Sequence, residues 1–499
     1  MGLLTGSHGV ETLLKSTFPT PWTECSKLTE LVEHYGATPK STAILLDGNV
    51  LVRQIPQSVD NFFKYTDVFM GFLTRALDAA DLVIVVWDEP EFLTKAKAEE
   101  QNKRDAQTKK AQIVCSEDIT PLLGPTNDDY VTSALHDHNP QHVVAHRAAR
   151  ARLYDEVVKT SLTQLDASGT LRQKDILFDG IDPRGADRPI GTPREAEMVG
   201  SNSWLETLMS RKVPIGEGDL KLPDLASQIQ YLRDTDKAFQ SIELIVMQTI
   251  DTDSIAIELM AAAARRDQLI QLPILKPMKV VLALRKKRTE KRAREEGLEI
   301  GIDCTATYFS LCEMDKLFES LVVHFKPPSG YERHLVALLV AGLALCKSDF
   351  VYFNGLRPDA ILAAMKMALD SKVDGFVANL LKPMTHTWNL DPTDNLDVIT
   401  QARDEMVSSI DALVGYATEA LLAIPRMKQA SNRVKNTAEL DRVMLLRRAS
   451  WVICYWSGAC ELTQLVEFGF PPPTQSADLD VPLPPALPHA PPSAPPPQP

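Results

Sequence analysis

Seven acidic residues stand at the ends of apolar runs or at the starts of expected helices: Asp47, Asp88, Glu195, Glu197, Asp251, Asp253 and Asp349. The run STAILLD ends in Asp47, DLVIVVWD ends in Asp88, and ELIVMQTIDTD ends in Asp251 and Asp253. In an open α/β sheet, residues just past the carboxyl ends of parallel strands meet in one crevice. Converging carboxylates repel one another unless divalent cations neutralise them, so the pattern predicts a Mg²⁺ or Mn²⁺ site. Two such ions would serve hydrolysis of a phosphodiester.

The elements that must position these acids follow from hydrophobic periodicity. Residues 41–90 are typical of strand, helix and strand, with the apolar stretches at 43–46, 59–79 and 82–87. Further strands are expected at 242–248 and 280–284. We therefore expect an α/β fold in which helices flank a central, mostly parallel sheet.

The remaining segments divide into loops and helices. Residues 175–193 are rich in Gly, Pro and Asp and are expected to be loop, while 211–237 resemble an insertion. A helix beginning near Pro193 would place Glu195 and Glu197 close to its first turn. Other helices are expected at 313–324, 331–346, 358–370 and throughout 394–468.

Composition narrows the functional class. The 499 residues are 44% hydrophobic and 24% charged, as in ordinary globular proteins. The sequence contains no run of eighteen apolar residues and no basic leader before an apolar stretch, so neither a membrane span nor a secretory signal is expected. Seven scattered cysteines favour reduced thiols in the cytosol or nucleus. A net charge of −13 argues against non-specific coating of nucleic acid, but not against a nuclease with bound metal.

Basic segments interrupt this acidic chain. The stretch after Asp88 and the expected helix at 141–165 carry the candidate nucleic-acid contacts, which are Lys95, Lys97, Lys103, Arg104, Arg147 and Arg150. The strongest run has seven Lys or Arg between Arg285 and Arg294. It is typical of a nuclear localisation signal, a phosphate-binding patch or a charged helix end. We expect a nuclear protein, with the cytoplasm as the alternative.

The order and setting of the acids resemble the flap endonuclease/XPG family of 5′ structure-specific nucleases, which have a PIN-like fold. The matching segments are the Met-Gly-Leu start, LLDGN, VVWDEP before a basic stretch, PREAEMVG, TIDTDSIAI and ALCKSDFVYFNGLRPDAILAAM. The resemblance spans about residues 1–370. An actual Phe-Asp-Gly sequence at 178–180, which follows the basic stretch, makes Asp179 the weaker alternative to Asp88.

The resemblance implies roles for these residues. Asp47, Asp88, Glu195 and Glu197 would hold one Mg²⁺ ion, and Asp251, Asp253 and Asp349 a second, with Mn²⁺ as an alternative metal. The basic stretch would form an arch over the 5′ strand, and a helix-hairpin-helix at 346–370 would hold duplex backbone through amides near Gly355. Two positions depart from the family, because Arg53 replaces a stacking aromatic residue and FNGLRP replaces Gly-Ile-Gly-Pro.

Four regions are expected along the chain. Residues 1–140 form an N-terminal nuclease region with the arch, 141–380 an internal nuclease region with the hairpin, and 381–470 a helical region. Residues 471–499 hold 13 prolines, which predicts a disordered tail able to present a polyproline II ligand to a protein partner. The expected function is a metal-dependent 5′ endo/exonuclease acting on DNA. The alternatives are a ribonuclease acting on messenger RNA and an inactive nucleic-acid-binding scaffold.

Overall fold

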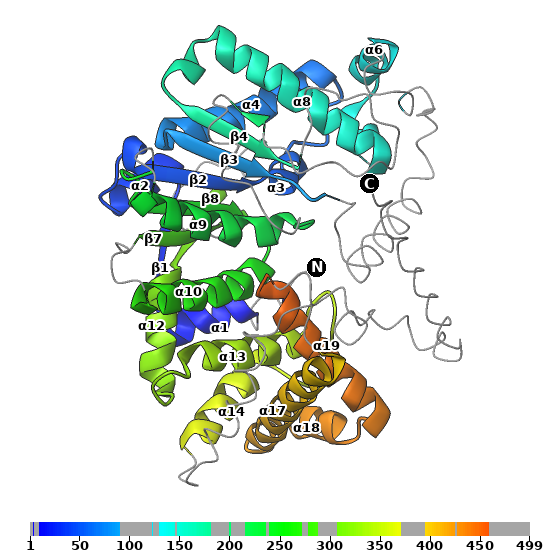
Figure 1. The fold of residues 1–499 in the computed structure, drawn as a ribbon. Coiled ribbons are helices and arrows are strands. Elements are labelled where there is room, and N and C mark those ends of the chain that lie inside the picture. The colour runs from blue at the N-terminus through cyan, green and yellow to red at the C-terminus, as the bar shows by residue number, and fades with distance from the viewer. Residues whose placement is uncertain are drawn as a thin grey trace, which may run out of the picture.

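The fold is built on a sheet that draws strands from most of the chain. A computed structural model describes residues 3, 9–89, 122, 129–144, 147–180, 199–200, 215–235, 239–271, 278–287, 307–370, 395–424 and 427–458. These residues form one eight-stranded sheet in the order β1-β8-β7-β6-β2-β3-β4-β5 (Figure 1). The strands are β1 (Trp22–Cys25), β2 (Thr42–Asp47), β3 (Leu82–Val86), β4 (Asp175–Asp179), β5 (Val199–Gly200), β6 (Leu244–Thr249), β7 (Lys279–Lys287) and β8 (Thr307–Glu313).

The centre of the sheet is parallel, which confirms the expected fold class. β7, β6, β2, β3 and β4 run parallel, whereas β8, β1 and β5 are antiparallel to their neighbours. The chain passes from β2 to β3 and β4 and then returns to β6 and β7 on the other side of β2. The connection therefore reverses between β2 and β6, and ligands of open α/β sheets bind at such a reversal. The PIN-like subtype remains a prediction.

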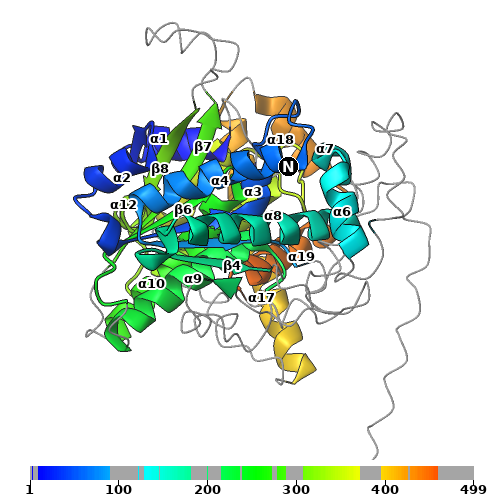
Figure 2. The same ribbon diagram turned by 90° about the horizontal axis from the view of Figure 1, so that it is seen from above.

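One face of the sheet is covered by helices from the first third of the chain. They are α2 (Leu28–His34), α3 (Gly48–Arg53), α4 (Phe62–Ala79) and α8 (Arg147–Ala167), with α6 (Asp129–Asp137) and α7 (Pro140–Val143) beside them. Figure 2 shows α4 and α8 crossing this face. Asn61 caps α4 by accepting hydrogen bonds from the amides of Phe63 and Lys64. The buried side of α4 packs in one core cluster with the odd-numbered residues of β3, Val83 and Val85, whose side chains point to this face of the sheet.

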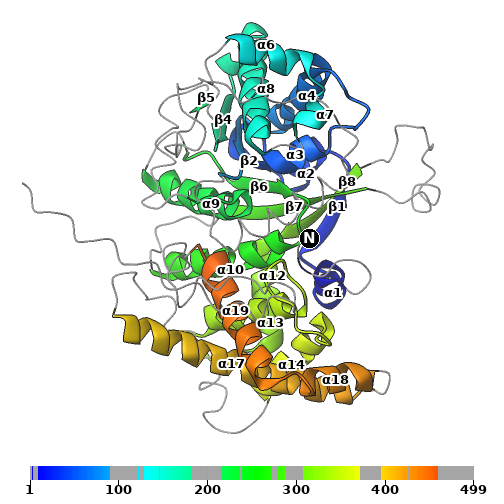
Figure 3. The ribbon, with the colours of Figure 1, turned by 90° about the vertical axis from the view of Figure 1, so that its right-hand side faces the viewer.

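The opposite face carries the other helices, which continue into a second helical layer. α9 (Gly218–Thr235) and α10 (Asp253–Gln271) lie against the sheet, with α12 (Met314–Phe325) and α13 (Glu332–Cys346) next to α10 (Figure 1). α1 (Val10–Thr17) contributes Val10 and Leu14 to the same core cluster. α14 (Pro358–Asp370), α17 (Leu396–Leu422), α18 (Lys428–Lys435) and α19 (Glu439–Trp456) follow. Figure 3 shows α19 rising from this layer towards α10. Two short 3₁₀ helices, η1 (Pro39–Ser41) and η4 (Thr170–Arg172), complete the described elements.

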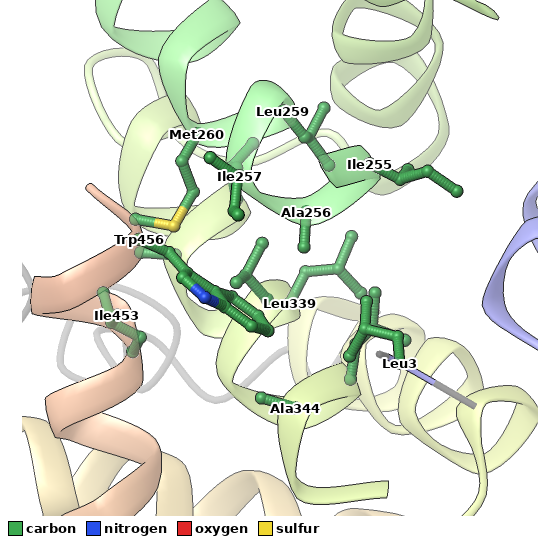
Figure 4. Close-up of a cluster of buried hydrophobic side chains, with 14 of the residues drawn as sticks. Leu3, Ile255, Ala256, Ile257, Leu259, Met260, Leu339, Ala344, Ile453 and Trp456 are labelled. Carbon is green, nitrogen blue, oxygen red and sulfur yellow. The ribbon is translucent and has the colours of Figure 1, made fainter. Parts of the chain in front are cut away.

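A single core joins the sheet to the C-terminal helices. Figure 4 shows Ile453 and Trp456 of α19 packed with Ile257 and Met260 of α10 and Leu339 of α13. The same cluster reaches strand residues such as Ile245. Strands from both sides of residue 140 are neighbours in the sheet, because β2 pairs with β6 and β3 pairs with β4, so residues 1–140 and 141–380 contribute to one sheet. Within the described part of the chain, no helix is long and apolar enough to span a bilayer.

Several expectations about elements are wrong. Residues 175–179, expected as loop, form β4 beside β3. Residues 218–235, expected to lie in an insertion, form α9, which packs on β2 and β3. The helix expected to begin near Pro193 lies outside the described residues, while Val199 pairs with Phe178 in the sheet. The expected strands at 43–46, 82–87, 242–248 and 280–284 are confirmed within two or three residues at their ends, as are the helices expected at 313–324, 331–346 and 358–370. Within the expected helical stretch at 394–468, the described residues form helices at 396–422, 428–435 and 439–456.

Candidate functional site

Asp47 lies where β2 passes into α3. Its carboxylate caps α3 by accepting the amide hydrogen bond of Val50 at 3.2 Å. Gly48 follows, and a Cβ at this position would lie 2.2 Å from the indole ring of Trp87. Only glycine therefore allows the Trp87 ring to pack directly on the start of α3. Because Trp87 precedes Asp88, this contact brings the ends of β2 and β3 together.

Three strand-end carboxylates influence one another. Burial, together with the charge of Asp88 and, to a smaller extent, that of Asp251, raises the pKa of Asp47 to about 7. The Val50 amide and the Arg53 guanidinium act in the opposite direction on that pKa. Neighbouring carboxylates disfavour the ionised form, so the shift indicates that Asp88 and Asp251 lie near Asp47. The three acids end or follow β2, β3 and β6, which pair in parallel, and therefore lie at the same edge of the sheet.

Asp88 is held by the start of α9. The amide of Gly218, the first residue of that helix, donates to Oδ1 of Asp88 at 2.8 Å. A helix N-terminus favours negative charge, which suits a carboxylate at this position. Glu217, directly before Gly218, accepts a hydrogen bond from the Tyr455 hydroxyl at 2.5 Å. Glu217 was not predicted from the sequence, since no apolar run or motif marks it.

The two acids of the Asp-x-Asp motif have different environments. Asp253 begins α10 and is buried, and its Oδ1 accepts the amide hydrogen bond of Leu3. The Thr252 hydroxyl donates to the Leu3 carbonyl at 3.0 Å, so Thr252 and Asp253 together hold the backbone of Leu3. Asp251 is half-buried, and its amide donates to Oγ1 of Thr249 at 3.2 Å. Asp251 is therefore the member of the pair that adds its charge to the Asp47 environment.

Asp349 lies in the turn between α13 and α14. Oγ of Ser348 accepts the amide hydrogen bonds of Phe350 and Val351 at 3.3 and 3.1 Å, which fixes the turn on both sides of Asp349. The Phe350 ring lies 4.9 Å from Trp451 and 5.7 Å from Tyr455, both on α19. The turn that carries Asp349 is therefore attached to the C-terminal helical layer.

Asp179, the alternative to Asp88, belongs to a buried ion cluster. It ends β4, and Nζ of Lys221 lies 3.3 Å from its Oδ1. Lys221 also pairs with Glu89, and all three side chains are at most 1% exposed. Asp88 is half-buried, whereas Asp179 is enclosed with a cation of the chain itself. This difference favours Asp88 as the acid that faces a ligand.

Positive and hydroxyl groups border the carboxylates on the α8 side. Burial raises the pKa of Tyr154 to about 12, with Arg150 and Arg53 lowering it and Asp88 and Asp47 raising it. These effects indicate that Arg150, Arg53, Asp88 and Asp47 all lie near Tyr154. The nucleic-acid contact expected of Arg150 stays a prediction. Tyr154 was not predicted, because a tyrosine on a helix carries no sequence signal of its own.

Other predicted site residues lie elsewhere or outside the described residues. Outside them are Glu195, Glu197, Lys95, Lys97, Lys103 and Arg104, and the side chain of Arg147. Gly355 has φ +104°, and a Cβ there would lie 2.6 Å from the Ala430 carbonyl, so α18 packs against this turn. Its predicted contact with duplex backbone remains a prediction, as does the helix-hairpin-helix.

The first members of the basic run are strand residues with partners in the fold. Arg285 donates to Gln54 and lies 5.3 Å from the Phe72 ring, while Nζ of Lys286 lies 2.5 Å from Oε2 of Glu11. Both residues lie on β7, so the alternative of a charged helix end is wrong for them. The part of the run from 288 to 294 lies outside the described residues.

The described acids do not form a complete metal-binding site. Among the residues that the structure places, no three carboxylate, imidazole or thiolate groups are arranged to hold one ion. The chemistry of the donor set nevertheless fits a cation, because Asp47, Asp88 and Asp251 supply carboxylate oxygens at the carboxyl ends of adjacent parallel strands. The chain matches no protein-family model and no curated protein.

Proposed function

We propose that this protein is a divalent-metal-dependent nuclease that hydrolyses phosphodiester bonds, with 5′-ended or branched DNA as its substrate. The observation that carries the proposal is the position of Asp47, Asp88 and Asp251 at the carboxyl ends of the adjacent parallel strands β2, β3 and β6, where the strand order of the sheet reverses. An open α/β sheet binds its ligand at that place. The resemblance to the flap endonuclease/XPG family supports the same chemistry, although the family membership itself is part of the proposal.

The residues around these acids would have different roles in the reaction. Asp47, Asp88 and Asp251 would hold Mg²⁺, with Glu195 and Glu197 added by resemblance. Divalent cations at such a site supply an activated water and stabilise the leaving oxygen. Arg53 and Arg150 lie beside the acids and would hold the phosphate, since guanidiniums bind phosphate oxygens well. Tyr154 would offer its hydroxyl as a hydrogen-bond donor, because burial keeps it protonated.

Cleavage of three labelled substrates tests this proposal. We would incubate the protein with 5′-flap DNA, single-stranded RNA of the same sequence and blunt duplex DNA, each with Mg²⁺ or with EDTA. We expect Mg²⁺-dependent cutting of the flap, and a loss of about a hundredfold or more in Asp88→Asn and Asp251→Asn with binding retained. Asp404→Asn, an exposed change on α17, is the matched control.

The outcomes separate the candidates. Preferential cutting of RNA would replace DNA as the substrate and keep the metal chemistry. Binding of nucleic acid without cutting would show a scaffold, and undiminished turnover in both Asp→Asn variants would remove these acids from the site.

A further inference from the structure

The last described helix of the chain, α19, reaches the carboxylate edge directly. The Tyr455 hydroxyl donates to Oε2 of Glu217 at 2.5 Å, and both side chains are buried. Glu217 immediately precedes Gly218, whose amide donates to Asp88 at 2.8 Å. Two hydrogen bonds, joined by the peptide bond between Glu217 and Gly218, therefore connect α19 to Asp88.

The segment between Tyr455 and Asp88 is held from two sides. On the sheet side, the Glu89 amide donates to the Gly216 carbonyl at 2.8 Å, and Lys221 joins Glu89 to Asp179. On the helical side, Tyr455 holds the carboxylate of Glu217. These two attachments set the position of the Gly218 amide, because Gly218 lies between Gly216 and Lys221.

The same tyrosine also contacts the turn that carries another acid. Trp451 and Tyr455 stack with ring centroids 4.9 Å apart at 15°, and Phe350 meets both rings edge to face. Phe350 follows Asp349 in the chain. One turn of α19 thus contacts Glu217, which precedes the residue bonded to Asp88, and Phe350, which follows Asp349. Asp88 lies just past β3, and Asp349 lies between α13 and α14.

We propose that Tyr455 is a positioning residue that sets the relation between Asp88 and Asp349, so that the C-terminal helices belong to the metal-binding framework. This inference rests on the proposed nuclease function. Groups that orient metal-binding side chains change metal affinity or activity by about 10- to 100-fold when they are removed. Tyr455 would act through Glu217 and Gly218 on one side and through Phe350 on the other.

The variant Tyr455→Phe isolates the hydrogen bond, because it keeps the aromatic contacts and removes only the hydroxyl. We would measure the Mg²⁺ dependence of single-turnover cleavage, the shift in thermal unfolding caused by Mg²⁺, and nucleic-acid binding in EDTA. We expect the half-saturating Mg²⁺ concentration to rise about tenfold in both metal assays. Nucleic-acid binding in EDTA should match wild type. Thermal unfolding in EDTA should begin at a lower temperature, because a buried carboxylate loses a hydrogen bond, so the Mg²⁺-induced shift is measured from each variant's own value in EDTA.

Two further variants separate positioning from general stability. Arg442→Gln removes the ion pair between α19 and Asp411 of α17, at the other end of the helix, and should leave the Mg²⁺ dependence unchanged. Glu217→Gln keeps a side-chain oxygen that can accept from Tyr455 and should resemble wild type, whereas Glu217→Ala should resemble Tyr455→Phe. The double variant Tyr455→Phe/Glu217→Ala should lose no more than either single change, since coupled residues are not additive.

The possible results distinguish a failure of the Tyr455 inference from a failure of the nuclease proposal. A wild-type Mg²⁺ dependence in Tyr455→Phe, or additive effects in the double variant, would overturn the inference while the nuclease proposal stands. A wild-type protein that neither cuts nucleic acid nor gains thermal stability from Mg²⁺ would overturn both.

Discussion

At the scale of single residues, Asp47 sets the electrostatic character of the site. Its pKa of about 7, against a usual 3.8, means that the folded protein keeps a proton that the unfolded chain releases. A raised carboxyl pKa costs no stability below the unfolded value, costs more as pH rises towards the folded value, and then stays constant. At pH 8 without metal this cost is about 4 kcal/mol at most.

Asp47→Asn should therefore stabilise the metal-free protein. Asparagine keeps the cap of α3 but removes the buried charge. In EDTA, we expect denaturant unfolding to show a gain of a few kcal/mol at pH 8 that becomes smaller at pH 5. Mg²⁺ should stabilise wild type and leave the variant unchanged. A variant that is less stable than wild type at pH 8, or a gain that grows as pH falls, would contradict the assigned shift.

The chemistry of individual acids was only partly visible in the sequence. Asp47, Asp88 and Asp251 could be predicted, because each follows an apolar run that ends at the same edge of a parallel sheet. The role of Asp253 could not, since it depends on the amide of Leu3, which is 250 residues away. Glu217 is likewise defined by Tyr455, 238 residues later. Contacts of such separation leave no local pattern.

At the scale of elements, the same dependence on residues far away in the sequence explains why α9 was not predicted. β2, β3, β6 and β7 were predictable because each contains a continuous buried apolar run. α9 contains the buried polar residues Lys221, Gln230 and Arg233 and an internal Pro223, which obscure its apolar side. Lys221 is tolerated there because Glu89 and Asp179 neutralise it. The helix therefore depends on partners from β3 and β4 that its own sequence does not reveal.

Replacing Lys221 by methionine tests this dependence. The variant would keep the apolar stem and leave Glu89 and Asp179 buried together without their cation. Removing one member of a buried ion pair costs about 3–5 kcal/mol, so we expect a loss of that size in the free energy of unfolding. Lys366→Met, which removes the exposed pair with Asp370, should cost less than about 1 kcal/mol. Equal losses in the two variants would show that the buried cluster is not needed for α9.

At the scale of the whole molecule, the C-terminal helices are continuous with the sheet. The family resemblance ended near residue 370, and the sequence could show only that the later residues are helical. Packing shows more, because α13 is buried from His334 to Cys346 between α10, α14, α17 and α19. A helix that is apolar on all sides must be surrounded by other elements. The second helical layer is therefore a requirement of the fold.

A shortened chain tests this continuity. Ending the protein at residue 394 would remove α17, α18 and α19 and expose the apolar surfaces of α13 and α14. We expect this form to lose its cooperative thermal transition and to bind a hydrophobic dye, since a large exposed apolar surface does not persist in a stable monomer. A chain ending at residue 458 keeps every described helix and should unfold like the full protein. A cooperative transition at the wild-type temperature in the shorter form would show that the sheet and its first helices fold alone, and that α19 only docks on a finished domain.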